Sequence, residues 1–137
     1  MRHILIALAG AATLLSGSAI AGQRADRSEK AEAKLAKALE GRVAGQPVNC
    51  INLRSVQSSQ IFDRTAILYK VGSTYYVNRP TNGASSLDDD DILLTKTFSS
   101  ELCSIDIVRL VDRSSRFETG FVGLGKFVPY KRPKKGA

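Results

Sequence analysis

The chain has 137 residues, two cysteines, one histidine and a formal charge of +7 at pH 7. This length fits a single domain with one modest core. The only histidine, His3, lies in a segment that we expect to be removed, which excludes histidine-dependent nucleophilic catalysis and the commonest zinc and copper ligand from the mature protein.

The first 21 residues have the three-part layout of a secretory signal peptide. Met1-Arg2-His3 is a short basic start, residues 4–15 are apolar, and Ala19-Ile20-Ala21 is a small-residue cleavage motif. A transmembrane anchor, the alternative, needs about 20 apolar residues, and this run is shorter and ends in Ser16-Gly17. We therefore expect cleavage between Ala21 and Gly22, no membrane span, and a periplasmic or secreted location.

The sequence divides into four parts. We expect a signal peptide over residues 1–21, a helical lead segment over 22–46, a disulfide-stapled β-rich domain over 47–130 and a basic tail over 131–137. Residues 22–46 carry six basic and four acidic side chains, whereas residues 47–130 carry nine of each. A neutral central region argues against nucleic-acid binding, which needs a basic folded face.

The basic tail, residues 131–137, contains four cations and no acid: Lys131, Arg132, Lys134 and Lys135. One interpretation is a solvated end of the chain. The other is contact of these four residues with anionic headgroups of the cell envelope.

The lead segment is rich in Ala, Lys and Glu, which favour helix. Asp26 and Glu29 have the spacing of a capping box, so we expect the helix to begin there, and Gly41 or Gly45 would end it. A narrow apolar stripe fits the docking of one helix edge onto a sheet; it consists of Ala31, Leu35, Leu39 and Val43.

From Pro47 onward, short β-rich runs alternate with turns. The clearest hairpin joins residues 65–71 and 74–78 through Gly72-Ser73, whose leading glycine suits a type II′ turn. Phe121–Val128, interrupted by glycines, predicts a bent or bulged final strand. Further strands are expected over residues 48–53, 92–98 and 105–111, the last as the central buried strand.

These elements predict an α+β fold. We expect a small twisted antiparallel sheet or partly open barrel of five or six strands, with the N-terminal helix on one face.

Cys50 and Cys103 are the only cysteines. Because an exported domain meets an oxidising compartment and the count is even, we expect them to form a disulfide. The bond would close a loop of more than 50 residues, which contributes about 4 kcal/mol on the chain-entropy model. Two buried free thiols are the alternative.

Two other motifs suggest ligands but fit them poorly. Asp88-Asp89-Asp90-Asp91 offers carboxylates to a hard cation such as Ca²⁺, yet contiguous side chains cannot all converge, so a solvated turn or helix caps are the alternatives. Gly120–Phe127 approaches the phosphate-loop pattern, but Phe127 replaces the hydroxyl that binds Mg²⁺ and no helix follows. We therefore predict no metal and no cofactor.

The tyrosines interleave with basic residues, as in single-strand nucleic-acid binders; the residues are Tyr69, Tyr75, Tyr76, Tyr130, Arg64, Lys70 and Arg79. Tyr75 and Tyr76 must point to opposite faces of one strand, so core and edge aromatics are the simpler interpretation.

Asp106 and Asp112 would lie about 20 Å apart along an extended strand, too far for a catalytic carboxylate pair. The sequence therefore predicts no enzyme.

Several short motifs follow one another in a characteristic order over residues 45–115. Cys50-Ile51 follows a helical lead, Asp63-Arg64-Thr65 and Tyr75–Asn78 come next, and Leu102-Cys103-x-x-Asp106 precedes an apolar strand. In these respects the chain resembles an uncharacterised family of short exported two-Cys proteobacterial proteins, known as a domain of unknown function. The resemblance implies a two-Cys exported domain and supplies no activity.

The leading hypothesis is a non-enzymatic periplasmic domain that binds a periplasmic protein or an envelope component. One alternative is a peripheral binder of the anionic envelope surface through the basic tail. The other is a histidine-independent enzyme of unknown reaction.

Overall fold

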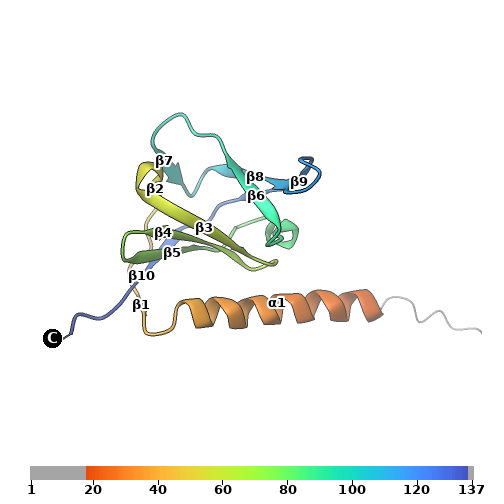
Figure 1. Cartoon of the computed structure of the whole chain (residues 1–137), viewed down its shortest axis with the longest axis horizontal. Coiled ribbons are helices and arrows are strands. Elements are labelled where there is room, and N and C mark those ends of the chain that lie inside the picture. The colour runs from red at the N-terminus through yellow and green to blue at the C-terminus, as the bar shows by residue number, and fades with distance from the viewer. Residues whose placement is uncertain (1–17, 136–137) are drawn as a thin grey trace, which may run out of the picture.

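The structure, a computed structural model, describes residues 18–135 and arranges them in three layers (Figure 1). One helix lies along a five-stranded antiparallel sheet, and a three-stranded sheet and a two-stranded ribbon lie on the other side. This layering lets each element bury its apolar face against a neighbour.

Helix α1 spans Ser18–Ala38. The expected start at Asp26 is wrong: Asp26 lies inside the helix, and its carboxylate accepts a 2.9 Å hydrogen bond from Lys30 Nζ one turn later. Alanines upstream of Asp26 continue the helical propensity, so no cap is needed there. The expected stop at Gly41 is confirmed, because the chain leaves the helix through a left-handed conformation at this glycine, with φ +74°.

The helix docks through the predicted narrow stripe. Ala31 and Leu35 are buried, Leu39 is half-buried, and Val43 lies beyond the helix end and is exposed. The two buried residues pack on a cluster from the five-stranded sheet, made of Phe62, Ala66, Leu68 and Val77. Two hydrogen bonds of 2.6 and 3.1 Å from the Arg79 guanidinium to Glu32 fasten the exposed side of the helix to the sheet.

Ten strands follow the helix: β1 (Val43–Ala44), β2 (Cys50–Asn52), β3 (Val56–Phe62), β4 (Ala66–Val71), β5 (Thr74–Asn78), β6 (Asp91–Thr95), β7 (Glu101–Cys103), β8 (Ile107–Asp112), β9 (Glu118–Gly123) and β10 (Phe127–Lys131). The five-stranded sheet has the order β1-β10-β5-β4-β3, the three-stranded sheet the order β6-β8-β9, and β2 pairs with β7. Two short 3-10 helices, η1 (Leu53–Ser55) and η2 (Ala84–Ser86), lie in the connections.

The predicted α+β class with an N-terminal helix is confirmed. The expected five or six strands in one sheet or partly open barrel are wrong, because the described residues form about ten strands in three antiparallel sheets, none of which closes into a barrel. Strands β1, β3 and β7 were not predicted. Their sequences are short or mostly polar, so they lack the alternation that marks a strand.

The predicted hairpin is confirmed. β4 and β5 pair up to Val71 and Thr74, with Gly72 at φ +58° as the first turn residue. β8 is the central strand of its sheet, as expected. It is not buried on both faces, however, because Val108 and Leu110 point into the core while Ile107 and Arg109 are exposed.

The predicted final strand over residues 121–128 is instead two strands in different sheets, β9 and β10. Glycines form the corner between them. The buried Asn78 side chain donates to Gly125 O at 2.7 Å and accepts from Gly125 N at 3.0 Å. Gly123 N likewise donates to Asn82 Oδ1 at 2.9 Å, and an added Cβ on Gly123 would lie 2.5 Å from that oxygen. The glycine-rich stretch is therefore a corner held by two asparagines.

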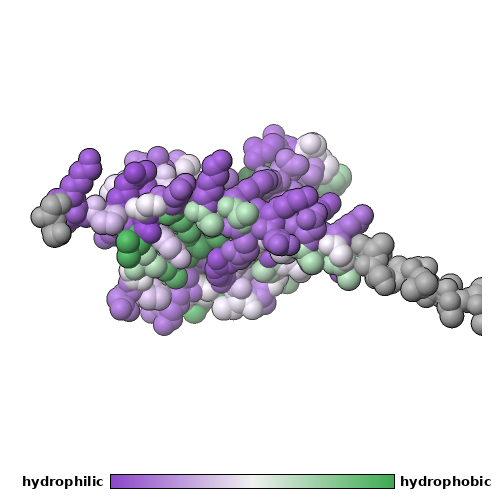
Figure 2. Space-filling model, turned by 90° about the horizontal axis from the view of Figure 1, so that it is seen from below, coloured by the Kyte–Doolittle hydropathy of each residue, from purple (hydrophilic) through white to green (hydrophobic). Residues whose placement is uncertain are grey.

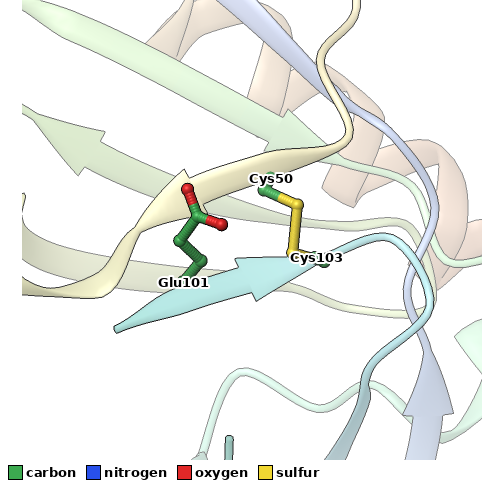
Figure 3. Close-up of side chains that lie close together, drawn as sticks. All are labelled: Cys50, Glu101 and Cys103. Atoms are coloured by element: carbon green, nitrogen blue, oxygen red, sulfur yellow. A yellow bond between two sulfur atoms is a disulfide. The ribbon is translucent and has the colours of Figure 1, made fainter. Parts of the chain in front are cut away.

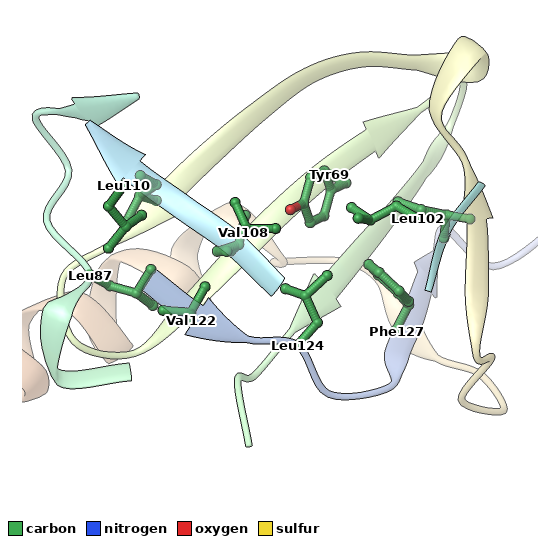
Figure 4. Close-up of a cluster of buried hydrophobic side chains, with 11 residues drawn as sticks. Tyr69, Leu87, Leu102, Val108, Leu110, Val122, Leu124 and Phe127 are labelled. Carbon is green, nitrogen blue, oxygen red and sulfur yellow. The ribbon is translucent and has the colours of Figure 1, made fainter. Parts of the chain in front are cut away.

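The main core fills the space between the sheets (Figure 4). Phe127 is its largest fully buried side chain and meets the Tyr69 ring edge-to-face, with centroids 5.9 Å apart. Aliphatic side chains from both sheets and from the disulfide ribbon surround this pair; they include Leu87, Leu102, Val108, Leu110, Val122 and Leu124. One continuous cluster thus joins all the β layers.

We expect Phe127→Ala to lower the free energy of unfolding by about 3–5 kcal/mol, because it leaves a cavity where the two sheets meet. The matched control is Phe98→Ala, since Phe98 is fully exposed and its loss should change stability by less than about 0.5 kcal/mol. Urea unfolding followed by circular dichroism measures both. Equal effects in the two variants would contradict the described core.

Candidate binding surfaces

The predicted disulfide is present between Cys50 of β2 and Cys103 of β7 (Figure 3). The two cysteines are directly paired residues of the antiparallel ribbon. Glu101 lies beside them, with a carboxylate oxygen within 4.8 Å of the sulfurs. Because both sulfurs are bonded to each other, this trio offers no thiolate to a metal. The bond suits an oxidising compartment outside the cytoplasm.

The Leu-Cys-x-x-Asp motif has a local structural role. Asp106 Oδ2 accepts a 2.7 Å hydrogen bond from Cys103 N, and Asp106 N donates to Cys103 O at 3.0 Å. The carboxylate thus closes the turn that leads from the disulfide into β8. Asp106 therefore orders the segment that follows the disulfide.

The acidic run forms a turn that leads into β6, and its carboxylates do not act together. Asp91 is buried and accepts a 2.6 Å hydrogen bond from Thr119 Oγ1. Asp88 accepts from Asp90 N, and Asp63 accepts from Asp89 N at 2.7 Å. Carboxylate oxygens of Asp63, Asp88 and Asp89 lie within 4.8 Å of one another, and in two of these groups one oxygen accepts a hydrogen bond from a backbone amide.

The basic tail leaves the sheet where β10 pairs with β1. All four predicted contact residues are exposed: Lys131, Arg132, Lys134 and Lys135. Lys131, Arg132 and Pro133 line an apolar groove of about 460 Å³ with Val43, Gly45, Gln46 and Pro129. Viewed from the side of α1, the surface is mostly hydrophilic, with an apolar area near the end from which the C-terminus leaves (Figure 2).

A second groove lies between the free edges of two different sheets. β3 is the outer strand of the five-stranded sheet, and β6 is the outer strand of the three-stranded sheet. Residues of both strands line a space of about 480 Å³, together with Asp89 and Arg113: Ser59, Gln60 and Ile61 from β3, and Asp91, Ile92 and Leu93 from β6. We call this space the edge groove.

The tyrosines do not form one stacking surface. Tyr69 is buried, Tyr75 and Tyr130 pack towards α1, and Tyr76 packs into the core between the sheets. The prediction that Tyr75 and Tyr76 face opposite sides of β5 is therefore confirmed. The Arg42 guanidinium lies 3.6 Å from the centroid of the Tyr75 ring, and this cation–π contact ties the connection between α1 and β1 to the sheet.

The predicted cleavage bond between Ala21 and Gly22 lies in the first turns of α1, where both residues are exposed. Most of the predicted signal peptide, residues 1–17, lies outside the described residues. Within residues 18–135, no helix combines the length and the apolar character that crossing a membrane requires.

Comparisons with known proteins give no match to a family model, to a curated protein or to a solved structure. The resemblance to the two-Cys exported family therefore stays a prediction, and the function has to be argued from the surfaces described above.

Among the described side chains, Tyr69 contributes the one buried polar atom without a hydrogen-bond partner, its hydroxyl oxygen. Burial raises the pKa of Tyr69 well above its ordinary value of 10. The folded protein keeps this phenol neutral while the unfolded chain ionises above pH 10, so stability falls as the pH rises through that value.

We therefore expect Tyr69→Phe to raise the free energy of unfolding by about 1 kcal/mol at pH 7, because it removes an unpaired polar group and keeps the ring. The variant should also lose stability less steeply above pH 10. Thermal unfolding at pH 7 and at alkaline pH measures both effects. A less stable variant at pH 7 would show that the hydroxyl makes a favourable contact.

Proposed function

We propose that this protein is a non-enzymatic exported domain that binds a partner protein by adding an extended segment of that partner to the free edge of β3. The observation that carries the proposal is the outer edge of β3 over residues 58–62, which pairs regularly with β4, has no lysine or proline and faces the edge groove. The predicted signal peptide and the disulfide support an extracytoplasmic location for this binding.

The β3 edge has one device that protects outer strands, a shift of register with β4 between Val56 and Ser58, and lacks the others over residues 58–62. β3 has seven residues, and Gln57, Ser58, Ser59 and Gln60 are all exposed. Natural edge strands are blunted by charge, by proline, by shortness or by a bulge. This run has neither Lys nor Pro, and beyond the register shift it pairs regularly with β4 from Ser58 to Phe62. The opposite edge of the same sheet is different, because β1 has only two residues. The sheet is therefore open to strand addition on one side only.

The edge groove also indicates the chemistry of the partner. A strand paired with β3 would lie beside the outer strand β6, so its alternate side chains would meet Ile61 and Leu93 on one side and solvent on the other. The lining holds Asp89, Asp91 and Arg113, but Asp89 lies 4.0 Å from Lys34 Nζ, and Asp91 is buried and bonded to Thr119. The groove therefore selects by its polar strand edge and apolar residues, which favours an extended segment in which polar and apolar side chains alternate.

Site-specific photo-crosslinking in cells tests this proposal. A photoreactive phenylalanine derivative at Gln57 should give one discrete protein adduct, whereas the same group at Ala44 on the short β1 edge should give none. A lysine on the edge, Gln60→Lys, should reduce the adduct by about tenfold, because a charged side chain on an outer strand opposes strand addition. The matched control Gln60→Asn should retain the adduct.

In the purified adduct, the backbone amides of β3 should exchange with solvent more slowly than in the free protein, because the added strand pairs with them. Adducts of equal yield at Gln57 and Ala44, or an adduct insensitive to Gln60→Lys, would contradict strand addition at this edge.

Envelope association through the basic tail is the second candidate, favoured by the groove that places two of the four exposed cations, Lys131 and Arg132, beside an apolar strip. Deleting residues 131–137 should abolish binding to phosphatidylglycerol vesicles at low salt, and about 0.5 M salt should release the intact protein. Vesicle co-sedimentation measures both effects. Unchanged, salt-insensitive binding after the deletion would reject this candidate.

A further inference from the structure

Three arginines surround one hollow beside the turn between β3 and β4. Arg24 and Arg27 come from α1, three residues apart and therefore on one side of the helix. Arg64 comes from the turn. Together with Ile20 and Gln23 they line a space of about 310 Å³ that contains no carboxylate. We call this space the arginine hollow.

None of the three guanidinium groups takes part in an ion pair within residues 18–135. The ion pairs found there involve other cations: Lys30 with Asp26, Lys34 with Asp89, Arg79 with Glu32, and Arg109 with Glu118. Like charges gathered without an acid repel one another, and a bound anion would remove that repulsion. The arrangement is thus electrostatically incomplete without an anion.

The backbone of Arg64 is held in an unusual conformation. Its φ is +55°, in the left-handed region that residues other than glycine, asparagine and aspartate seldom adopt. Arg64 N donates to Leu87 O at 3.0 Å, and its Nη1 donates to Ser85 O at 2.9 Å. These contacts impose the conformation and partly fix the half-buried side chain before any ligand arrives. Arg116 has a similar backbone conformation in another turn, with φ +64°, so this conformation places the Arg64 side chain and does not by itself mark a binding site.

We infer that the arginine hollow binds a phosphate group. A guanidinium presents a planar fork of donors that matches phosphate oxygens, and Arg64 spends only one of its five donors on Ser85. A carboxylate carries one charge and two oxygens and would satisfy one arginine. A phosphate monoester carries up to two charges and three free oxygens, which suits three converging arginines.

The hollow is larger than one ion needs, so the phosphate can be inorganic or belong to a lipid headgroup. Cleavage between Ala21 and Gly22 would remove Ile20 and leave all three arginines in the mature protein. The hollow shares no residue with the edge groove. The phosphate site therefore stands independently of the proposed strand addition.

Isothermal titration of the purified exported protein with inorganic phosphate at low ionic strength tests the inference. Arg64→Gln should weaken binding by about tenfold, and so should the double variant Arg24→Gln, Arg27→Gln, since each loses charge-assisted hydrogen bonds. The matched control is Arg54→Gln, an exposed arginine outside the hollow, which should change the affinity by less than about twofold.

A second arm identifies the source of the phosphate. Binding to vesicles that contain phosphatidic acid, whose headgroup is a phosphate monoester, would assign a lipid headgroup if it is absent with phosphatidylcholine vesicles and weakened by Arg64→Gln but not by Arg54→Gln. Arg64-dependent binding of inorganic phosphate without vesicle binding would assign a soluble ligand. No binding in either arm, or equal losses in the Arg64 and Arg54 variants, would overturn the site.

Arg64→Gly separates binding from folding. Glycine accepts the left-handed backbone without strain, so this variant should melt at the same temperature as the parent or higher, and should still lose phosphate binding about tenfold. A variant that melts at or above the parent temperature and binds phosphate with undiminished affinity would show that Arg64 contributes nothing to the site.

Discussion

The architecture depends on how Asn78 holds Gly125. This fully buried side chain uses both its oxygen and its nitrogen on the backbone of one glycine, so its burial costs little. The pair fixes the corner at which the chain leaves β9 and enters β10. Because these strands belong to different sheets, the corner joins the sheets along one side and encloses the core around Phe127. Removing either partner would leave buried polar groups unpaired.

The openness of the other side follows from the same corner. β10 lies near one end of the five-stranded sheet and β9 at one end of the three-stranded sheet, so the strands furthest from the corner are β3 and β6. No residue pairing in the described chain links these two strands. The edge groove is therefore a consequence of topology. The two sheets are joined at the β9–β10 corner, and the outer strands on the opposite side, β3 and β6, have no partner strand on their outer edges.

Local signals predicted what local chemistry controls. A few neighbouring residues predict the Gly72-Ser73 turn and the apolar stripe at Ala31 and Leu35. The oxidising compartment expected for an exported domain predicts the cysteine pair. β3 was missed because Gln57–Gln60 has no apolar alternation, and a strand of this kind is held by pairing with β4. The glycines near Gly123 were interpreted as a bend, because their asparagine partners lie more than 40 residues away. The arginine hollow likewise needs tertiary contacts that place Arg64 beside α1.

The structure divides the positive charge of the two ends into groups with different physical properties. The four cations of the tail are exposed on an extended segment, so their attraction to anions is screened by salt and costs side-chain entropy on binding. Arg64 is half-buried, tethered to Ser85, and lines the same hollow as Arg24 and Arg27. A preorganised guanidinium loses less entropy when a ligand binds. Under the proposed phosphate site, selectivity for the anion would come from the hollow, and the tail would add long-range attraction without geometric discrimination.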